Sequence, residues 1–404
     1  MIVEANQNTG NNHEPASAVR WFLKLGVVGF CILFFSFPIL NDLFPTFRKL
    51  PPYGVTQITP SLSLNRQSYV TRTYQRKAEQ LAKKRSGLWR PFTLIGNEIV
   101  FRGFNQVTPF HSGSVFMGGD GQLVQTLHLD SFNRKAASKG EGKKVLEQLS
   151  NLKLLQDFQA KRGKSVIAVI SPNVTEIYPE TVPKRYRAAG REKRDSAYDR
   201  FKRDADRIGI NYVDGPKILM QAKQNFPFRM YARTGSHWND VASCLVLQQL
   251  NEQLKKAGTA TLPEFECTPW NLEFPLRDKD IDLLKIANLF YPERLYEPAP
   301  YVQFTPVPKS TKRPVITMSG SSYLFAFAES FKKRNLSEDH VHYFYYRQRK
   351  SRNSPKFIDI QRNKMPWDVI LNREITIVEA PMRGPSAIGY GFIADAVKNL
   401  DKVK

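Results

Sequence analysis

The chain has 404 residues, 41% of them hydrophobic, which allows one large domain or two ordinary ones with a sizeable core. Its formal net charge of +23 at pH 7 favours a polyanionic partner, which means nucleic acid, anionic lipid headgroups or an acidic polysaccharide. The sequence has no zinc-ligand spacing, Walker loop or RNP-type aromatic motif, so nothing beyond charge favours nucleic acid. We expect no nucleic-acid partner, no metal site and no cofactor.

An almost continuous apolar run occupies residues 21–40 and is interrupted only by Lys24. A helix of about 20 such residues spans a bilayer. The small-residue cleavage site of a secretory signal peptide does not follow Leu40. We therefore predict an uncleaved transmembrane anchor. Because a short tail before a large C-terminal body is typical of export, we place residues 1–20 in the cytoplasm and the body outside it.

Residues 41–114 are predicted to form a basic stalk or extension. This stretch is rich in Pro, Tyr and Arg, and one basic helix is expected from Ser68 to Arg85. Such a helix either lies near anionic headgroups or is simply solvated, and the composition fits both.

From residue 115 helical and strand patterns alternate, which predicts an α/β domain with a mainly parallel sheet covered on both faces. A turn is expected at Gly118–Gly121. The predicted helices are 142–161, 194–207, one from Pro216, one from the His237 turn to Lys256, and one from Leu324. The predicted strands are 165–170, 210–214, 229–232, 313–318, 342–347 and others near 368–380.

Two polar turns follow predicted strands and precede predicted helices. The first is Arg233–Asp240, which contains His237, and the second is Gly320–Tyr323, which contains Ser322. A serine on a strand-to-helix turn is exposed, and the following helix N-terminus offers N–H groups to an oxyanion. Functional turns gather at the carboxyl ends of parallel strands. We therefore expect His237 and Ser322 to meet as a base and a nucleophile.

Five segments also follow one another in a characteristic order. They are Gly118–Leu123, Pro172–Asn173 with Tyr178–Glu180, Arg233–Asn239, Asp282–Leu283 and Gly320–Tyr323. In this order they resemble the periplasmic SGNH-hydrolase-like domains of the alginate O-acetyltransferase J and X type. The resemblance covers nearly all of residues 115–404. It implies a three-layer α/β domain, here preceded by one transmembrane helix.

What the resemblance implies about function is specific. Members of this family are anchored in, or secreted across, the inner membrane and acetylate an exopolysaccharide. An integral-membrane O-acyltransferase supplies their acetyl group. The chain is therefore expected to be a single-pass inner-membrane protein with a periplasmic O-acyltransferase domain. Its expected partners are a polysaccharide, anionic in view of the charge, and that membrane-bound donor.

Carried over by position, Ser322 is the expected nucleophile and His237 the base that activates it. The family's acid does not carry over, because Gly235 replaces the aspartate two residues before the histidine. Asp240 or Asp214 would then have to orient the imidazole, unless a backbone carbonyl does so. An aspartate introduced at position 235 would be expected to restore the acid.

The expected oxyanion and site-lining groups lie near the nucleophile. The backbone N–H of Ser322 or of Tyr323 is the natural oxyanion donor, and Asn173 is a candidate side-chain donor. Asn173 equally fits an ordinary residue of the turn that ends a strand. Ser321 stands where the family has the aspartate of its Gly-Asp-Ser block.

Three functions fit these observations. The first is polysaccharide O-acylation through a Ser-His acyl-enzyme, with acetyl as the acyl group that the resemblance implies. The second is a catalytically impaired relative that binds polysaccharide or scaffolds an acetylation complex, because both family aspartates are missing. The third is an esterase, which differs from the first only in passing the acyl group to water.

Three cysteines occur, Cys31, Cys244 and Cys267. Outside the cytoplasm, Cys244 and Cys267 either form a disulfide or remain as buried thiols, and the sequence leaves both open.

Overall fold

The computed structural model describes residues 21–32, 36, 61–86, 89–104, 106–107, 115–134, 139–191, 194–354 and 356–403. The chain divides into two compact units, Met1–Gly96 and Asn97–Lys404. The predicted cytoplasmic tail, residues 33–35 and 37–40 of the predicted anchor, and residues 41–60, 87–88, 105 and 108–114 of the predicted stalk lie outside the described residues.

The first unit contains short helices. Residues 21–32 are helical, and within the described residues no helix is both long and apolar enough to cross a membrane. The predicted basic helix is in fact two helices, α2 (Arg66–Val70) and α3 (Thr73–Ser86). Arg72 separates them because its φ of 57° is left-handed and cannot continue a helix.

Helix α4 (Trp89–Phe104) was not predicted. Its sequence contains Pro91 and Gly96, and these two residue types usually indicate a loop. Pro91 lies in the first turn, where a missing N–H costs no helical hydrogen bond.

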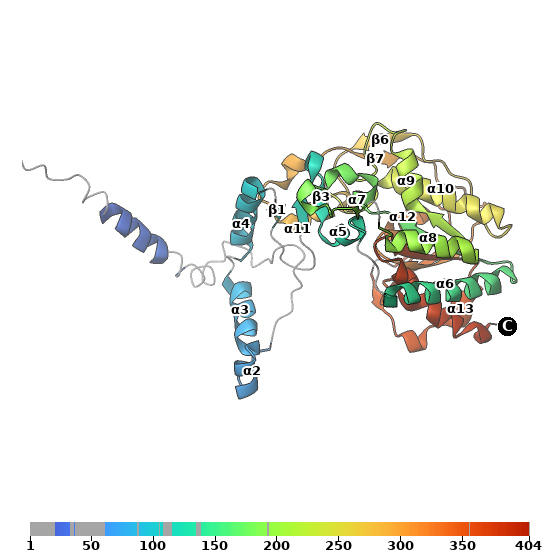
Figure 1. Ribbon diagram of the computed structural model, residues 1–404, viewed down its shortest axis with the longest axis horizontal. Coiled ribbons are helices and arrows are strands. Elements are labelled where there is room, and N and C mark those ends of the chain that lie inside the picture. Colours follow the sequence, from blue (N-terminus) through green and yellow to red (C-terminus); the bar gives the residue numbers. More distant parts are fainter. Residues whose placement is uncertain are drawn as a thin grey trace, which may run out of the picture. The chain divides into compact units, whose positions relative to one another are not determined.

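The second unit is an α/β domain (Figure 1). Its strands are β1 (Gln106–Val107), β2 (Val115–Met117), β3 (Leu123–Gln125), β4 (Ser165–Ser171), β5 (Tyr212–Asp214), β6 (Trp270–Glu273), β7 (Ala299–Val302), β8 (Val315–Gly320), β9 (Asp339–Phe344), β10 (Gln348–Ser351), β11 (Ile358–Asp359) and β12 (Ile375–Pro381). Its further helices are α5 (Leu127–Phe132), α6 (Lys139–Ala160), α7 (Val174–Ile177), α8 (Ala197–Ile208), α9 (Gly215–Ala222), α10 (Asp240–Lys256), α11 (Asp282–Ala287), α12 (Leu324–Lys333), α13 (Trp367–Asn372) and α14 (Phe392–Val397).

In the part of the chain that the structure describes, the main sheet has the strand order β11-β10-β9-β8-β12-β4-β5. The strands from β9 to β5 pair in parallel, as predicted, whereas β10 and β11 add an antiparallel edge. The turns after β8, β12 and β4 therefore leave the same edge of the sheet. This edge carries the site described below.

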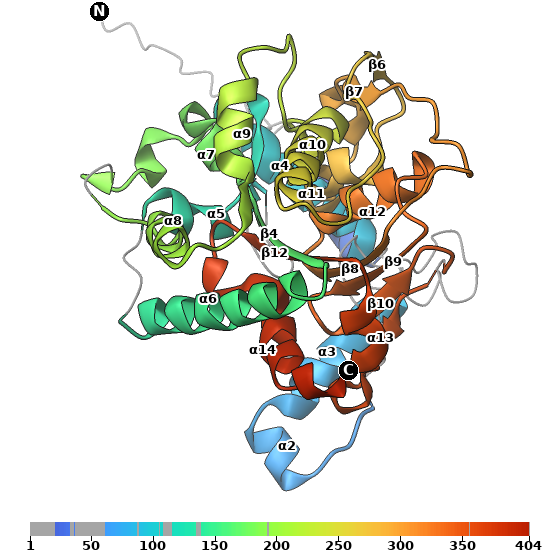
Figure 2. The same ribbon diagram turned by 90° about the vertical axis from the view of Figure 1, so that its right-hand side faces the viewer.

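Helices cover both faces of the main sheet. Figure 2 shows α9, α10 and α12 on one face and α6, α13 and α14 on the other. Strand β4 illustrates why, because all seven of its residues are buried and its side chains alternate between the two cores. Val169 packs in the first core and Ala168 in the second. The three-layer arrangement that the alternating pattern predicted is therefore present.

One predicted strand was wrong, and another prediction was confirmed only in part. Residues 229–232 form no strand of the sheet, and only Tyr231 makes an isolated antiparallel bridge, to Trp238. The segment is thus one arm of a hairpin that ends in the His237 turn. In the region 368–380, the first part belongs to helix α13 and only Ile375–Pro381 is a strand. The helix is just six residues long, too short for its periodicity to distinguish it from a strand.

Cys244 and Cys267 are joined by a disulfide, with Cα atoms 5.7 Å apart. The bond connects α10 to the long link that follows it, and both cysteines are buried beside Val241 and Val302. The sequence left open whether these cysteines form a disulfide or remain as buried thiols, and in the structure they form the disulfide. The link is thereby held against the helix that starts three residues after His237.

We predict that replacing both cysteines, in Cys244→Ser/Cys267→Ser, lowers the free energy of unfolding by about 3 kcal/mol, because the bond limits the unfolded chain across a 23-residue separation. Urea unfolding of the oxidised protein and of the double variant measures this difference. The reduced wild type should match the double variant. Equal stability of oxidised and reduced wild type would contradict the prediction.

Candidate active site

The turn after β8 presents Ser322. Strand β8 ends at Gly320, and α12 begins at Leu324, so Ser322 lies on a tight strand-to-helix connection. Ser321 is buried and Ser322 is partly exposed. A nucleophilic serine needs this combination, in which the backbone is held and the side chain is accessible.

The buried carboxyl group of Glu379 binds the backbone of the turn that carries Ser322. Glu379 of β12 is fully buried, accepts a hydrogen bond from the Ser321 N–H at 2.6 Å and another from the Ser171 hydroxyl. Burial raises the pKa of Glu379, and these two hydrogen bonds oppose the rise. A Cβ at Gly320 would lie 2.6 Å from Glu379 Oε2, so only glycine fits between the turn and the carboxylate. Sequence analysis missed Glu379, the one charged residue of strand β12.

The hairpin before α10 presents His237. Its two arms are joined by the Tyr231–Trp238 bridge and by the Asn239 N–H, which donates to the Met230 carbonyl at 2.9 Å. The Gly235 N–H donates to the Ala232 carbonyl at 3.2 Å and closes the turn. Because the Asn239 side chain caps α10 through the Ala242 N–H, the helix fixes where the hairpin ends.

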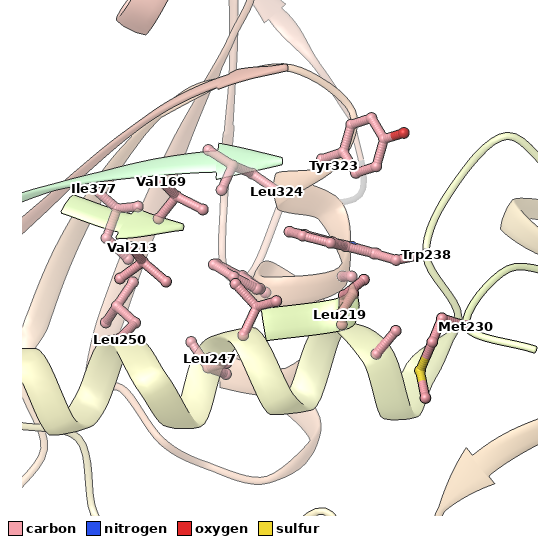
Figure 3. Close-up of a cluster of buried hydrophobic side chains, with 14 of the residues drawn as sticks. Val169, Val213, Leu219, Met230, Trp238, Leu247, Leu250, Tyr323, Leu324 and Ile377 are labelled. Carbon is pink, nitrogen blue, oxygen red and sulfur yellow. The ribbon is translucent and has the colours of Figure 1, made fainter. Parts of the chain in front are cut away.

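Two aromatic residues connect the His237 hairpin to the Ser322 turn. Tyr323 donates its hydroxyl to the Ser236 carbonyl at 3.0 Å, and its ring lies edge-on to Trp238 with centroids 5.1 Å apart. Trp238 is fully buried and stacks on Phe327 of α12. Figure 3 shows Trp238 and Tyr323 side by side in this apolar cluster. The core therefore sets the separation of the two turns.

His237 and Ser322 face one another. His237 Nε2 lies 2.7 Å from Ser322 Oγ, which is hydrogen-bond distance. The two side chains come from segments 85 residues apart in the chain. The meeting of the two turns that the sequence predicted is therefore present in the structure.

The orienting acid of His237 is Asp282, the first residue of α11. Asp282 Oδ2 lies 3.0 Å from His237 Nδ1, while Oδ1 accepts the Ser236 N–H at 2.7 Å. The Ser236 hydroxyl donates to the same carboxylate. Ser236 Oγ also lies 3.1 Å from His237 Nδ1. A proton on Nδ1, facing these oxygens, leaves Nε2 free to accept from the Ser322 hydroxyl. Ser322, His237 and Asp282 thus have the connectivity of a nucleophile, base and acid triad.

Asp240 and Asp214, which the sequence offered as the acid, point elsewhere. Asp240 pairs with Lys279 at 3.3 Å and accepts the Val302 N–H at 3.0 Å. Burial favours a higher pKa for Asp240, but the Lys279 charge and that hydrogen bond hold it below its ordinary value. Asp214 caps α9 through the Lys217 N–H. Both choices rested on nearness in sequence, whereas the acid comes from 45 residues beyond the histidine.

Gly235 has a packing reason to be glycine. A Cβ at this position would lie 2.6 Å from the Lys279 carbonyl oxygen and 3.0 Å from Asp280 Cα. The backbone that leads into Asp282 thus occupies the space that a side chain at 235 would need. Asp282 and an aspartate at 235 exclude each other, so the expectation that Gly235→Asp restores an acid is wrong.

The remaining predicted site residues are the candidate oxyanion donors, Ser322, Tyr323 and Asn173, and their neighbour Ser321. The Tyr323 N–H points to Ser321 Oγ at 3.3 Å, whereas among the described residues no acceptor binds the Ser322 N–H. The Ser322 N–H is therefore the better candidate for an oxyanion donor. Asn173 is fully buried, and its Nδ2 lies 3.5 Å from Ser131 Oγ. Its side chain also hydrogen-bonds to that of His128.

His128 is a residue of the site region that sequence analysis missed. Burial, followed by the charges of Arg383 and His237, lowers its pKa to about 3, so it is neutral at physiological pH. Only its position shortly after the Gly118–Gly121 turn hinted at a place near the site. Across the residues that the structure describes, no group of three or more His, Cys, Asp or Glu side chains is arranged to hold a metal ion.

Residues 130–329, which include the three triad positions, match the family model described as the SGNH hydrolase-like domain, acetyltransferase AlgX. No curated protein matches the chain.

Solved structures with similarity to the chain include three bacterial proteins. The O-acetyltransferase domain of Pseudomonas putida AlgJ is 17% identical, with a TM-score of 0.45, over 72% of this chain and 99% of that domain. Pseudomonas aeruginosa AlgX is 14% identical, with a TM-score of 0.41, over 71% of this chain and 67% of AlgX. Bacillus cereus PatB1 is 10% identical, with a TM-score of 0.42, over 70% of this chain and all of that one.

The family match covers the hairpin of His237, the link with Asp282 and the turn of Ser322. This chain has Gly235 and Ser321 at the two positions where the resemblance implies aspartates. Residues 130–329 of this chain are therefore a divergent SGNH hydrolase-like domain of the AlgX family.

Proposed function

We propose that the protein is an O-acyltransferase, most simply an O-acetyltransferase, that modifies hydroxyl groups of a cell-envelope polysaccharide or exopolysaccharide. The observation that carries the proposal is the pair of contacts made by the His237 ring, a hydrogen bond of 2.7 Å between Nε2 and Ser322 Oγ and a separation of 3.0 Å between Nδ1 and Asp282 Oδ2. A structural serine needs neither a histidine at 2.7 Å nor a carboxylate behind it.

The first half-reaction forms an acyl-enzyme. Ser322 Oγ attacks the acyl carbonyl of the donor while His237 Nε2 accepts the hydroxyl proton. Asp282 stabilises the imidazolium, and the Ser322 N–H donates to the developing oxyanion. When the tetrahedral intermediate collapses, the donor oxygen leaves and takes the proton from Nε2. The acyl group then remains as an ester on Oγ.

The second half-reaction passes the acyl group to a sugar. A sugar hydroxyl loses its proton to His237 Nε2 as its oxygen attacks the acyl carbon. Oγ then leaves and takes that proton back, so the enzyme is regenerated and a sugar ester is formed. Water in place of the sugar would make the same site an esterase, and the ratio of transfer to hydrolysis distinguishes the two.

Charge and shape near the site support an anionic polysaccharide as acceptor. A groove of about 490 Å³ runs along the 229–234 arm of the hairpin that carries His237, beside the triad and not lined by it. Its lining includes Tyr178, Lys223, Arg229 and Arg233, together with Glu297, which pairs with Arg233, so cations outnumber carboxylates. The Arg229 guanidinium lies 3.8 Å from the centre of the Tyr178 ring. Aromatic faces beside cations suit sugar rings that carry negative groups.

The reason for proposing a non-catalytic, scaffolding relative no longer applies. It rested on the two missing family aspartates at positions 235 and 321. Asp282 takes the place of the first beside His237, and Glu379 supplies a carboxylate to the Ser321 turn in place of the second. Substitution of the family acids therefore does not by itself indicate an inactive site.

We further propose that the domain is anchored in the inner membrane and works in the periplasm with a membrane-bound O-acyltransferase as its acyl donor. The apolar run at 21–40 supports the anchor. The Cys244–Cys267 disulfide supports an oxidising compartment, because such bonds are rare in the cytosol of most bacteria.

Export is tested with alkaline phosphatase fused after the C-terminus, since this reporter is active only outside the cytoplasm. We expect an active fusion, and an inactive one when residues 21–40 are deleted. An inactive full-length fusion, together with an active cytoplasmic reporter at the same position, would contradict export.

The catalytic role is tested by complementing a strain from which the gene is deleted. We expect that Ser322→Ala and His237→Ala each abolish O-acetylation of the envelope glycan, because neither variant can form the acyl-enzyme at a useful rate. Exposed Ser63 offers the matched control Ser63→Ala, which should restore wild-type acetylation. If Ser322→Ala also restores it, the protein acts as a scaffold and the enzyme proposal fails.

The acid is tested with Asp282→Asn and Gly235→Asp. Asp282→Asn should lower kcat for p-nitrophenyl acetate about a thousand- to ten-thousand-fold, because the imidazole loses its orientation and its counter-charge. Gly235→Asp should lower both the activity and the melting temperature, because the new Cβ meets the Lys279 carbonyl. A Gly235→Asp variant more active than wild type would show that Asp282 is not the acid.

A further inference from the structure

Ser236 lies directly before His237 and is only 9% exposed. Sequence analysis gave it no role, because serine is an ordinary residue of polar turns. In the structure its N–H donates to Asp282 Oδ1 at 2.7 Å, and its hydroxyl donates to Asp282 Oδ2. Its Oγ lies 3.1 Å from His237 Nδ1, and its carbonyl accepts the Tyr323 hydroxyl at 3.0 Å. All polar groups of Ser236 are therefore engaged by residues of the active-site region.

The Asp282 carboxylate depends on Ser236 for its orientation. Among the residues that the structure describes, hydrogen-bond donors to this carboxylate come from Ser236 and His237 alone, and no Lys or Arg lies within ion-pair distance of it. Each carboxylate oxygen takes one hydrogen bond from Ser236, so a rotation of the carboxylate breaks both bonds. Ser236 therefore holds the acid in the orientation in which Oδ2 lies 3.0 Å from His237 Nδ1.

Ser236 also shares the Nδ1 side of the imidazole with Asp282. Nδ1 of His237 has Asp282 Oδ2 at 3.0 Å and Ser236 Oγ at 3.1 Å. Because the Ser236 hydroxyl proton is donated to Asp282, a lone pair of its oxygen is available to an Nδ1–H. A proton on Nδ1 thus meets two oxygens. Both favour the tautomer in which Nε2 accepts from the Ser322 hydroxyl.

The Ser236 carbonyl connects the base to the turn of the nucleophile. Tyr323, which follows Ser322, is buried and donates its hydroxyl to this carbonyl at 3.0 Å. The centre of the Tyr323 ring lies 5.0 Å from the centre of the His237 imidazole. One hydrogen bond thus joins the residue before the base to the residue after the nucleophile. A change in the distance between His237 and Ser322 would strain that bond.

We propose that Ser236 is a positioning residue of the triad, which fixes the Asp282 carboxylate through its N–H and hydroxyl and sets the approach of His237 to Ser322 through its carbonyl. The inference rests on the proposed function and adds a residue to its machinery. In this role Ser236 acts through Asp282 and His237 rather than on the acyl donor or the acceptor, and its hydroxyl proton stays on Oγ in both half-reactions. Three side chains from separate segments are thereby kept in their reactive arrangement, in which small displacements are costly to the rate.

The role of the hydroxyl is tested with Ser236→Ala. This variant should lower kcat for p-nitrophenyl acetate by about ten- to a hundredfold and leave KM unchanged, because a hydrogen bond to a charged carboxylate is lost and a substrate contact is not. Ser236→Thr keeps the hydroxyl and should restore kcat to within about threefold of wild type. A kcat of Ser236→Ala within about twofold of wild type would overturn the inference. So would a Ser236→Thr variant that has the wild-type melting temperature and is as slow as Ser236→Ala.

A double-mutant cycle shows whether the hydroxyl acts through Asp282. In an Asp282→Ala background the carboxylate is gone, so Ser236→Ala should change kcat there by less than about twofold. If it lowers kcat as much in that background as in wild type, Ser236 does not act through the acid and the inference fails. Tyr323→Phe, which keeps the ring and removes the hydroxyl, should lower kcat about tenfold with KM unchanged. An unchanged kcat in Tyr323→Phe would overturn the part of the inference that concerns the carbonyl.

Ser243→Ala is the matched control for the loss of a buried serine hydroxyl. Ser243 is 1% exposed, and its hydroxyl donates to the Asp240 carbonyl at 2.9 Å within α10. The control should lower the melting temperature about as much as Ser236→Ala does and leave kcat as in wild type. If both variants lower kcat equally at an equal loss of melting temperature, the Ser236 hydroxyl has only a structural role and the inference fails.

The inference and the proposed function can fail separately. If wild type neither releases p-nitrophenol nor acetylates an oligosaccharide, the transferase proposal fails. Proton NMR of the hydrogen-bonded His237 Nδ1–H, assigned by its absence from His237→Ala, then decides the inference. A resonance that is present in wild type and in Ser243→Ala, and is lost or shifted in Ser236→Ala, supports it. A resonance that is absent from wild type, or unchanged in Ser236→Ala, overturns it.

Discussion

The Asp282 carboxylate is the contact on which the geometry of the site depends. It pairs with His237 Nδ1, and it accepts both the N–H and the hydroxyl of Ser236, so it fixes the hairpin as well as the imidazole. The hairpin can come this close only because position 235 is glycine. One carboxylate thus sets the tautomer of the base and the position from which it reaches Ser322.

The two replaced family aspartates have a common physical explanation. At each of the two turns a carboxylate is needed, one to orient the histidine and one to hold the backbone beside the serine. Asp282 provides the first from the link after α10, and Glu379 provides the second from the neighbouring strand β12. In both places a small residue makes room, Gly235 for the link and Gly320 for Glu379. A carboxyl group is present at each turn although its position in the sequence differs from that in the family.

The sequence was sufficient where a pattern repeats locally or where a turn has a characteristic composition. Alternating apolar segments predicted the layered α/β domain, and the two polar turns predicted that His237 and Ser322 meet. The acid could not be predicted, because Asp282 approaches through a long irregular link whose path depends on packing and on the Cys244–Cys267 bond. Glu379 could not be recognised either, since one carboxylate inside a buried strand has no periodic signature.

The most direct test of the account is mass spectrometry of the acyl-enzyme. Wild-type protein is mixed with p-nitrophenyl acetate, quenched in acid and digested, and the peptide that contains Ser322 is sequenced. The account predicts one acetyl group on Ser322, which disappears when acceptor oligosaccharide is added before the quench and is absent from His237→Ala. An unmodified Ser322 peptide during turnover, or acetylation at another residue that turns over with the acceptor, would contradict it.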